Sequence, residues 1–150
     1  MKTLSLTILA GIILSFSALA QDYNTRIPLL GEMTPKFTAQ STMGEINFPE
    51  DYNMKWKIIF SHPADFTAVC SSEILNLASM YEEFKELNTE ILVLSTDGLS
   101  SHMAWVESLE SINYPGNEPQ EIKFPLIADP NLEISKKFGM IHSYTSKTRD

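Results

Sequence analysis

The sequence predicts an α/β fold in which strands and helices alternate along the chain and pack in layers. Three short apolar runs have the length of buried strands, at residues 57–60, 91–94 and 124–127. Apolar residues recur at helical spacing in three other segments, at residues 74–84, 101–110 and 131–138. A strand, a helix and a second strand in succession imply a parallel crossover, which makes the central sheet at least partly parallel.

The first 20 residues have the pattern of a cleavable signal peptide. Lys2 supplies a positive charge, an almost uncharged apolar run extends from Leu4 to Leu19, and Ala18 and Ala20 form a small-x-small cleavage site. Because the run is short for a bilayer span of about 20 residues, we expect removal rather than membrane anchoring. We therefore expect an exported protein, periplasmic or secreted, with residues 21–150 as one domain and no membrane association after signal removal.

At the start of that domain the sequence predicts an irregular segment followed by a hairpin. Proline and glycine recur between residues 22 and 36 and discourage regular structure there. Residues 37–48 predict two strands that turn at Met43 and Gly44. The run 57–60 then predicts a buried strand.

Each helix has its own boundary signals. Residues 74–84 predict one amphipathic helix between two strands. For the helix at 101–110 we expect Ser100 or Ser101 as the N-cap. Asp129 begins the last helix, with Pro130 in its first turn.

The end of that last helix is marked by Gly139, because glycine readily adopts the left-handed conformation that closes a helix.

The composition also limits the partners. A net charge of −8 argues against nucleic acid, whose phosphates would be repelled. The three histidines, His62, His102 and His142, are about forty residues apart and lack ligand spacing, so we expect no metal site.

The single cysteine, Cys70, is the first candidate for chemistry. A buried cysteine can act simply as a small apolar residue, and that alternative is open on composition alone. Its position in the first turn of a predicted helix favours a thiolate, because helix N-termini carry unpaired N–H groups and a partial positive charge. A thiolate is also a weaker nucleophile when it is strongly stabilised, so a fast reaction needs further groups that bind the substrate.

Two residues before Cys70 are candidates for that role. Thr67 lies one helical turn earlier, so its hydroxyl can share a small pocket with the sulfur and can both donate and accept hydrogen bonds. Pro63 offers a rigid apolar wall that limits water near the sulfur. Structural alternatives are open for both: Thr67 as a helix N-cap and Pro63 as a turn that ends a strand.

Together these residues resemble a known family. Pro63, Thr67 and Cys70 match the Pro-x-x-x-Thr-x-x-Cys active-site motif of the peroxiredoxins, which include alkyl hydroperoxide reductase and thiol-specific antioxidant proteins. The run from Phe60 to Glu73 looks most like the one-cysteine subgroup. Further similarity at residues 97–105, 124–129 and 139–140 extends the match over about residues 28–145.

The resemblance implies a thioredoxin-like fold and a thiol peroxidase without metal or haem. Cys70 would attack hydrogen peroxide or an organic hydroperoxide and become a sulfenic acid. Thr67 would position the peroxide, Pro63 would shield the sulfur, and Glu73 would support the surrounding hydrogen bonds. His62 is expected either to hydrogen-bond near the site or to be structural. The resemblance also implies a homo-oligomer, and a role in antioxidant defence.

The sequence departs from the family pattern in two ways. The family's active-site arginine lies on a later strand, and we expect that residue just beyond Asp150 unless Arg149 takes its place. The domain is therefore expected to be truncated at its C-terminus. No second cysteine is present in the 150 residues, so recycling would need an external thiol, thioredoxin-like or of low molecular weight, or a cysteine outside them.

Two other functions are alternatives to a thiol peroxidase. A thioredoxin-like dithiol oxidoreductase needs Cys-x-x-Cys, whereas this chain has Cys70 followed by two serines and Glu73. A non-catalytic or chaperone-like protein could use the same fold. The intact set of Pro63, Thr67 and Cys70 favours the peroxidase.

Overall fold

The computed structural model describes residues 27–113 and 118–141. The expected signal peptide at 1–20, its cleavage site, His142 and Arg149 lie outside the described residues. In the part of the chain that is described, no helix is both long enough and apolar enough to cross a membrane.

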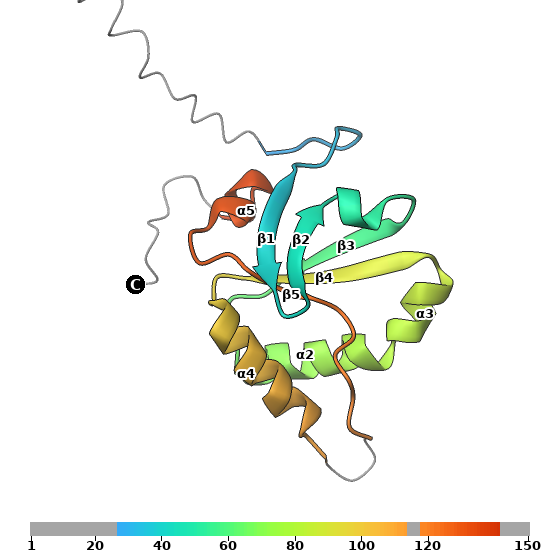
Figure 1. The fold of residues 1–150 in the computed structure, drawn as a ribbon, viewed down its shortest axis with the longest axis vertical. Coiled ribbons are helices and arrows are strands. Elements are labelled where there is room, and N and C mark those ends of the chain that lie inside the picture. The colour runs from blue at the N-terminus through green and yellow to red at the C-terminus, as the bar shows by residue number, and fades with distance from the viewer. Residues whose placement is uncertain (1–26, 114–117, 142–150) are drawn as a thin grey trace, which may run out of the picture.

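The centre of the molecule is one five-stranded mixed sheet (Figure 1), in the order β2-β1-β5-β4-β3. β3, β4 and β5 pair in parallel, whereas β1 is antiparallel to both of its neighbours. The predicted α/β architecture, with a parallel crossover from β3 to β4, is confirmed. The strands are β1 Phe37–Ser41, β2 Gly44–Phe48, β3 Trp56–Ser61, β4 Thr89–Ser95 and β5 Leu126–Ala128.

The hairpin predicted at 37–48 is confirmed with a turn one residue earlier than expected. Ser41 pairs with Gly44, so Thr42 and Met43 form the turn. Gly44 has a φ of 99°, a conformation that costs glycine little, and this explains its position directly after the turn. The Ser41 hydroxyl donates to the Gly44 carbonyl at 2.7 Å and closes the loop. Residues 27–36 contain neither helix nor strand, as predicted.

The predicted single helix at 74–84 is wrong in one respect, because two helices occupy this region. α2 spans Ala68–Ser79 and α3 spans Tyr81–Glu86, with Met80 between them at a φ of −97° and a ψ of 2°. The Ser79 hydroxyl donates to the Asn76 carbonyl at 2.8 Å. This local bond competes with the backbone ladder at the point where α2 ends.

The next helix, α4 Leu99–Glu110, begins earlier than predicted, and the expected serine caps are absent. Gly98 is the N-cap residue, and its carbonyl accepts the N–H groups of Ser101 and His102. Ser100 and Ser101 therefore lie inside the first turn. Serine near the start of a helix favours the N-cap position, but here Gly98 occupies that position.

The last helix, α5 Glu133–Lys137, starts two residues later than expected. Its N-cap residue is Leu132 and not Asp129, and Pro130 lies before the helix instead of in its first turn. The Asp129 carboxylate accepts the backbone N–H groups of Ile134 and Ser135 at 3.1 and 2.8 Å. It also accepts the Ser135 hydroxyl at 2.7 Å. Gly139, with a φ of 67°, follows the helix in the left-handed conformation, as its sequence position predicted.

The two faces of the sheet form two separate cores. α2 and α4 cover one face (Figure 1), where Ile91 and Val93 pack with Trp105. The alternate residues Leu92 and Leu94 face β1, β2 and α5. Every residue of β4 is buried, as a strand covered on both faces requires.

The prediction that residues 57–60 form a fully buried strand is wrong. β3 is an edge strand of the described sheet, so Ile58 is 41% exposed and the preceding Trp56 is 75% exposed. Phe60, at the other end of the strand, still packs under α2. Apolar composition alone cannot distinguish a central strand from an edge strand.

Candidate active site

The loop between β3 and α2 carries the candidate residues and is fixed at several points. The His62 backbone N–H donates to the Leu94 carbonyl at 3.1 Å and holds the loop against β4. The Asp65 backbone N–H donates to the Asp97 carboxylate at 2.6 Å. Phe66 has a φ of 57°, a left-handed conformation that is strained for a residue with a side chain. The loop therefore holds its shape through specific contacts.

Cys70 is the third residue of α2, as the sequence predicted. Its side chain is 6% exposed and packs in the core cluster with Ile74, Ala78 and Trp105. At this position it lies beside the first N–H groups of a 12-residue helix, which have no acceptors within the helix. The thiol is thus shielded from bulk water and lies at the end of α2 that carries unpaired N–H groups, which can donate to a sulfur that bears negative charge.

Thr67 is the N-cap residue by position, but its side chain does not cap the helix. Its backbone is extended, with a φ of −85°, and its carbonyl accepts the Ser71 N–H at 2.9 Å. Its hydroxyl donates instead to the Ala64 carbonyl at 3.0 Å. Because the hydroxyl proton is used there, the oxygen can serve a substrate only as an acceptor.

The other predicted residues lie in different surroundings. Pro63 is exposed at the surface of the loop, and Glu73 is exposed on α2. Glu73 has no hydrogen-bond or ion-pair partner among the described residues, so its supporting role stays a prediction. His62 is buried and belongs to a polar cluster that the sequence did not predict.

That cluster joins His62, Asp65 and His102. The two oxygens of the Asp65 carboxylate bind one imidazole each: Oδ1 lies 3.0 Å from His62 Nε2, and Oδ2 lies 2.8 Å from His102 Nδ1. The other nitrogen of His102, Nε2, lies 3.2 Å from the Ile127 carbonyl. All three side chains are almost completely buried. The cluster ties the loop before Cys70 to α4 and β5.

The Asp65 carboxyl group is ionised in this setting. Burial raises its pKa, but hydrogen bonds from His102, His62 and Ser101 lower the pKa more, to well below its ordinary value. The pairing between Asp65 and His102 could not be predicted from the sequence, because 37 residues separate them. The spacing of His62 and Asp65, three residues apart in one loop, is the only local signal that could have suggested part of the cluster.

Trp105 connects this cluster with Cys70. Its ring lies 4.9 Å, centroid to centroid, from the His62 ring. Its indole N–H donates to the Ser71 hydroxyl at 3.2 Å, next to Cys70 in α2. With 1% exposure, Trp105 is a core residue, as expected, and it also fixes the spacing between the histidine cluster and the first turn of α2.

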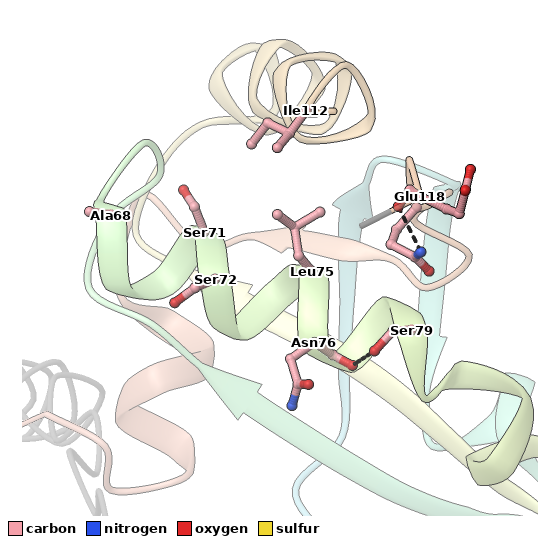
Figure 2. A pocket seen from close by; sticks show the side chains of 9 residues that line it. Ala68, Ser71, Ser72, Leu75, Asn76, Ser79, Ile112 and Glu118 are labelled. Carbon is pink, nitrogen blue, oxygen red and sulfur yellow. Dashed lines mark hydrogen bonds between the residues drawn. The ribbon is translucent and has the colours of Figure 1, made fainter. Parts of the chain in front are cut away.

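A cavity of about 370 Å³ lies between α2, Ile112 and the segment that contains Glu118 and Gln120. Figure 2 shows Ser71 and Leu75 of α2 pointing toward Ile112, and Glu118 also lines the cavity. Cys70 does not line this cavity, because its side chain points to the sheet. The cavity is therefore not a pocket in which a substrate meets the thiol.

Among residues 27–113 and 118–141, no group of three histidine, cysteine or acidic side chains could hold a metal ion.

Comparison with known proteins identifies the family. The model of the AhpC/TSA family matches residues 30–149. A peroxiredoxin of Methanosarcina mazei is 49% identical over 124 residues, which is 82% of this chain and 57% of that protein. A peroxiredoxin of Aquifex aeolicus is 48% identical over 122 residues, which is 81% of this chain and 53% of that protein. The chain thus belongs to the peroxiredoxin (AhpC/TSA) family, and it spans little more than half the length of these relatives.

Solved structures agree with this assignment. The yeast mitochondrial 1-Cys peroxiredoxin has a TM-score of 0.68 at 31% identity and is matched over 77% of this chain and 52% of its own. A peroxiredoxin 6 of Arenicola marina, solved as a cysteine-to-serine mutant, has a TM-score of 0.67 at 30% identity, over 79% of this chain and 52% of its own. The predicted thioredoxin-like fold of the peroxiredoxin type is thereby confirmed for the described part.

Proposed function

We propose that the protein is a thiol-dependent peroxidase that reduces hydrogen peroxide and organic hydroperoxides at Cys70. The observation that carries this proposal is the position of the single cysteine: it is shielded, lies in the first turn of α2, and follows a loop held in a strained shape. The membership in the peroxiredoxin family supports the same reaction. No observation favours the non-catalytic or chaperone-like alternative.

The proposed reaction needs one bond to form and one to break. The Cys70 thiolate attacks the terminal oxygen of the hydroperoxide, so that an S–O bond forms while the O–O bond breaks. Cys70 becomes a sulfenic acid, and the departing oxygen takes up a proton and leaves as water or alcohol. The oxygen of Thr67 accepts a hydrogen bond from the peroxide and holds it in line. Pro63, at the surface of the same loop, limits the approach of water.

An external thiol would return Cys70 to the reduced state. The sequence contains one cysteine, so no disulfide can form within these 150 residues. The structure of the yeast 1-Cys relative is described as one of thiol resolution through the glutathione and thioredoxin systems. We infer that this protein uses a reductant of the same two kinds. By its resemblance to the family we also propose that it forms a homo-oligomer and serves antioxidant defence.

We further propose that the protein is exported. The apolar run from Leu4 to Leu19 and the small residues at Ala18 and Ala20 support a cleavable signal peptide. N-terminal sequencing of the protein recovered from its native cells should begin at Gln21. A protein that retains Met1 would contradict export by this route.

Steady-state peroxide consumption tests the proposed activity. We expect turnover that depends on both a hydroperoxide and an added thiol, with dithiothreitol as the first reductant tried. Cys70→Ser should abolish this turnover, while Cys70→Ser protein keeps the wild-type circular dichroism spectrum. Unchanged consumption in Cys70→Ser would show that another group, or a contaminant, reduces the peroxide.

A further inference from the structure

The cavity of about 370 Å³ beside α2 takes no part in the proposed reaction, because Cys70 does not line it. Its volume lies at the lower end of the range of about 300–1,000 Å³ that is usual for small-molecule sites. The cavity extends along α2 from Ser71 to Ser79 (Figure 2), which are separated by about 12 Å of helix at 1.5 Å per residue. It therefore suits a small, elongated molecule.

The middle of the cavity is apolar. Leu75 points from α2 toward Ile112 (Figure 2). Both side chains pack against the core cluster that contains Trp105, but both are only partly buried. An alkyl chain that covers their exposed parts removes apolar surface from water, and this favours binding.

The polar side chains of the α2 wall offer lone pairs more than protons. The Ser79 hydroxyl donates to the Asn76 carbonyl at 2.8 Å. The Ser72 hydroxyl donates to the Val69 carbonyl at 2.7 Å. With their protons used in this way, both hydroxyl oxygens can only accept hydrogen bonds from a ligand. A ligand group that carries several protons is therefore complementary to this wall.

The charges at the cavity are negative. Glu118 is the one ionisable side chain among the described residues that line it, and its carboxylate has no ion-pair partner in that part of the chain. Figure 2 shows Glu118 toward the same end of α2 as Ser79, where the last carbonyl groups of the helix add a partial negative charge. This end of the cavity favours a cation and disfavours a carboxylate or a phosphate.

We propose that this cavity is a binding site for a small aliphatic amine that is protonated at neutral pH. The alkyl chain lies against Leu75 and Ile112, and the ammonium group faces Glu118 and the C-terminal end of α2. The ammonium protons supply the donors that the Ser79 oxygen and the Glu118 carboxylate lack. The site is separate from Cys70, so this inference does not depend on the proposed peroxidase function.

Trp105 provides a signal for occupancy of the cavity. Its indole N–H donates at 3.2 Å to the hydroxyl of Ser71, which lines the cavity. A ligand beside Ser71 changes the surroundings of that hydroxyl, so we expect the fluorescence of Trp105 to change on binding. The sequence contains one other tryptophan, Trp56, and Trp56→Phe leaves Trp105 as the sole source of the signal.

Titration of the full chain with hexylamine, 1-hexanol and hexanoate tests the charge preference with an unaltered cavity, because the three probes have the same chain length and differ at one end. Calorimetry and Trp105 fluorescence follow binding. We expect hexylamine to bind with a Kd of about 1 mM, as is usual for so small a ligand. We expect 1-hexanol to bind about fivefold more weakly and hexanoate at least about tenfold more weakly. Equal affinities for the three probes, or no saturable binding of hexylamine, would overturn the inference.

Two variants locate the binding site. Leu75→Trp fills the cavity and should weaken hexylamine binding at least about tenfold. Glu118→Gln keeps the shape of the side chain and removes its charge, so it should weaken hexylamine binding about two- to fivefold and leave 1-hexanol binding unchanged. Glu121→Gln is the matched control, because Glu121 is an exposed glutamate that does not line the cavity.

The control should bind hexylamine as the wild type does. An equal loss of affinity in Glu118→Gln and Glu121→Gln would show a general effect of surface charge and overturn the inference. Wild-type affinity for hexylamine in Glu118→Gln would do the same, even if Leu75→Trp does not fold. Peroxide consumption by the same samples is measured separately, so a failure of the proposed peroxidase activity is distinguished from a failure of this binding site.

Discussion

Replacement of Thr67 by valine is the change that most directly tests how the peroxide is held. Valine has nearly the same shape as threonine, so the substitution removes the hydroxyl and little else. In the wild type the hydroxyl proton is used by the Ala64 carbonyl at 3.0 Å, and the oxygen retains lone pairs that a peroxide O–H can donate to. Thr67→Val removes that acceptor from the transition state.

The expected size of the effect follows from the number of bonds lost. One positioned hydrogen bond that strengthens in the transition state is worth about 10²-fold in rate, or about 2.7 kcal/mol. The bond to Ala64 is also lost, but a single part-buried hydrogen bond contributes only about 0.5–1.5 kcal/mol to stability. The variant should therefore remain folded and oxidise about 100-fold more slowly.

Stopped-flow mixing with limiting hydrogen peroxide measures this rate, and urea unfolding of the same samples measures the loss of stability. Thr67→Ser is the matched control, since serine keeps the hydroxyl and should stay within a few-fold of the wild type. A Thr67→Val protein that oxidises at the wild-type rate would refute the role given to this residue. Equal slowing in Thr67→Ser would assign the effect to packing rather than to the hydroxyl.

Two further predictions concern Asp65 and Trp105. The pKa of Asp65 is lowered in the folded protein, so its contribution to stability is complete above the unfolded pKa of about 3.9 and is lost as the pH falls below it. The urea concentration at the midpoint of unfolding should thus fall less steeply below pH 4 in Asp65→Asn than in the wild type. Plots of this midpoint against pH that run parallel for the two proteins would contradict the prediction. Trp105 contacts both His62 and Ser71, so oxidation of Cys70 should change its fluorescence. The change should therefore be seen in Trp56→Phe, which keeps Trp105, and should be absent in Trp105→Phe. A fluorescence change that comes from the exposed Trp56 would contradict this prediction.

The sequence was most informative where one local pattern determines the structure. The run at 91–94 is continuously apolar because β4 is buried on both faces, and this is visible without any partner. The Asp129 carboxylate accepts N–H groups from the first turn of α5, and Gly139 lies just past the end of that helix, so both act within a few residues of it. The position of Cys70 in a first helical turn follows from the same kind of local pattern.

Features that depend on distant contacts could not be predicted in this way. The run at 57–60 is as apolar as that at 91–94, but only the strand order shows that β3 lies at an edge. The left-handed Phe66 has no glycine or asparagine signal in the sequence. Asp65 and His102 were missed because the fold, and not their spacing, brings them together.

The relative rate of Cys70 oxidation tests the central claim most directly. Wild-type protein and free cysteine are mixed in one tube with a limiting amount of hydrogen peroxide, and the products are measured by mass spectrometry after a brief reaction. Since Thr67 alone is expected to contribute about 10²-fold, Cys70 should gain one oxygen, or a disulfide with the added thiol, at least about 100-fold faster than free cysteine. Equal rates for Cys70 and free cysteine would contradict the account, because the structure around the thiol would then contribute nothing to its reaction with peroxide.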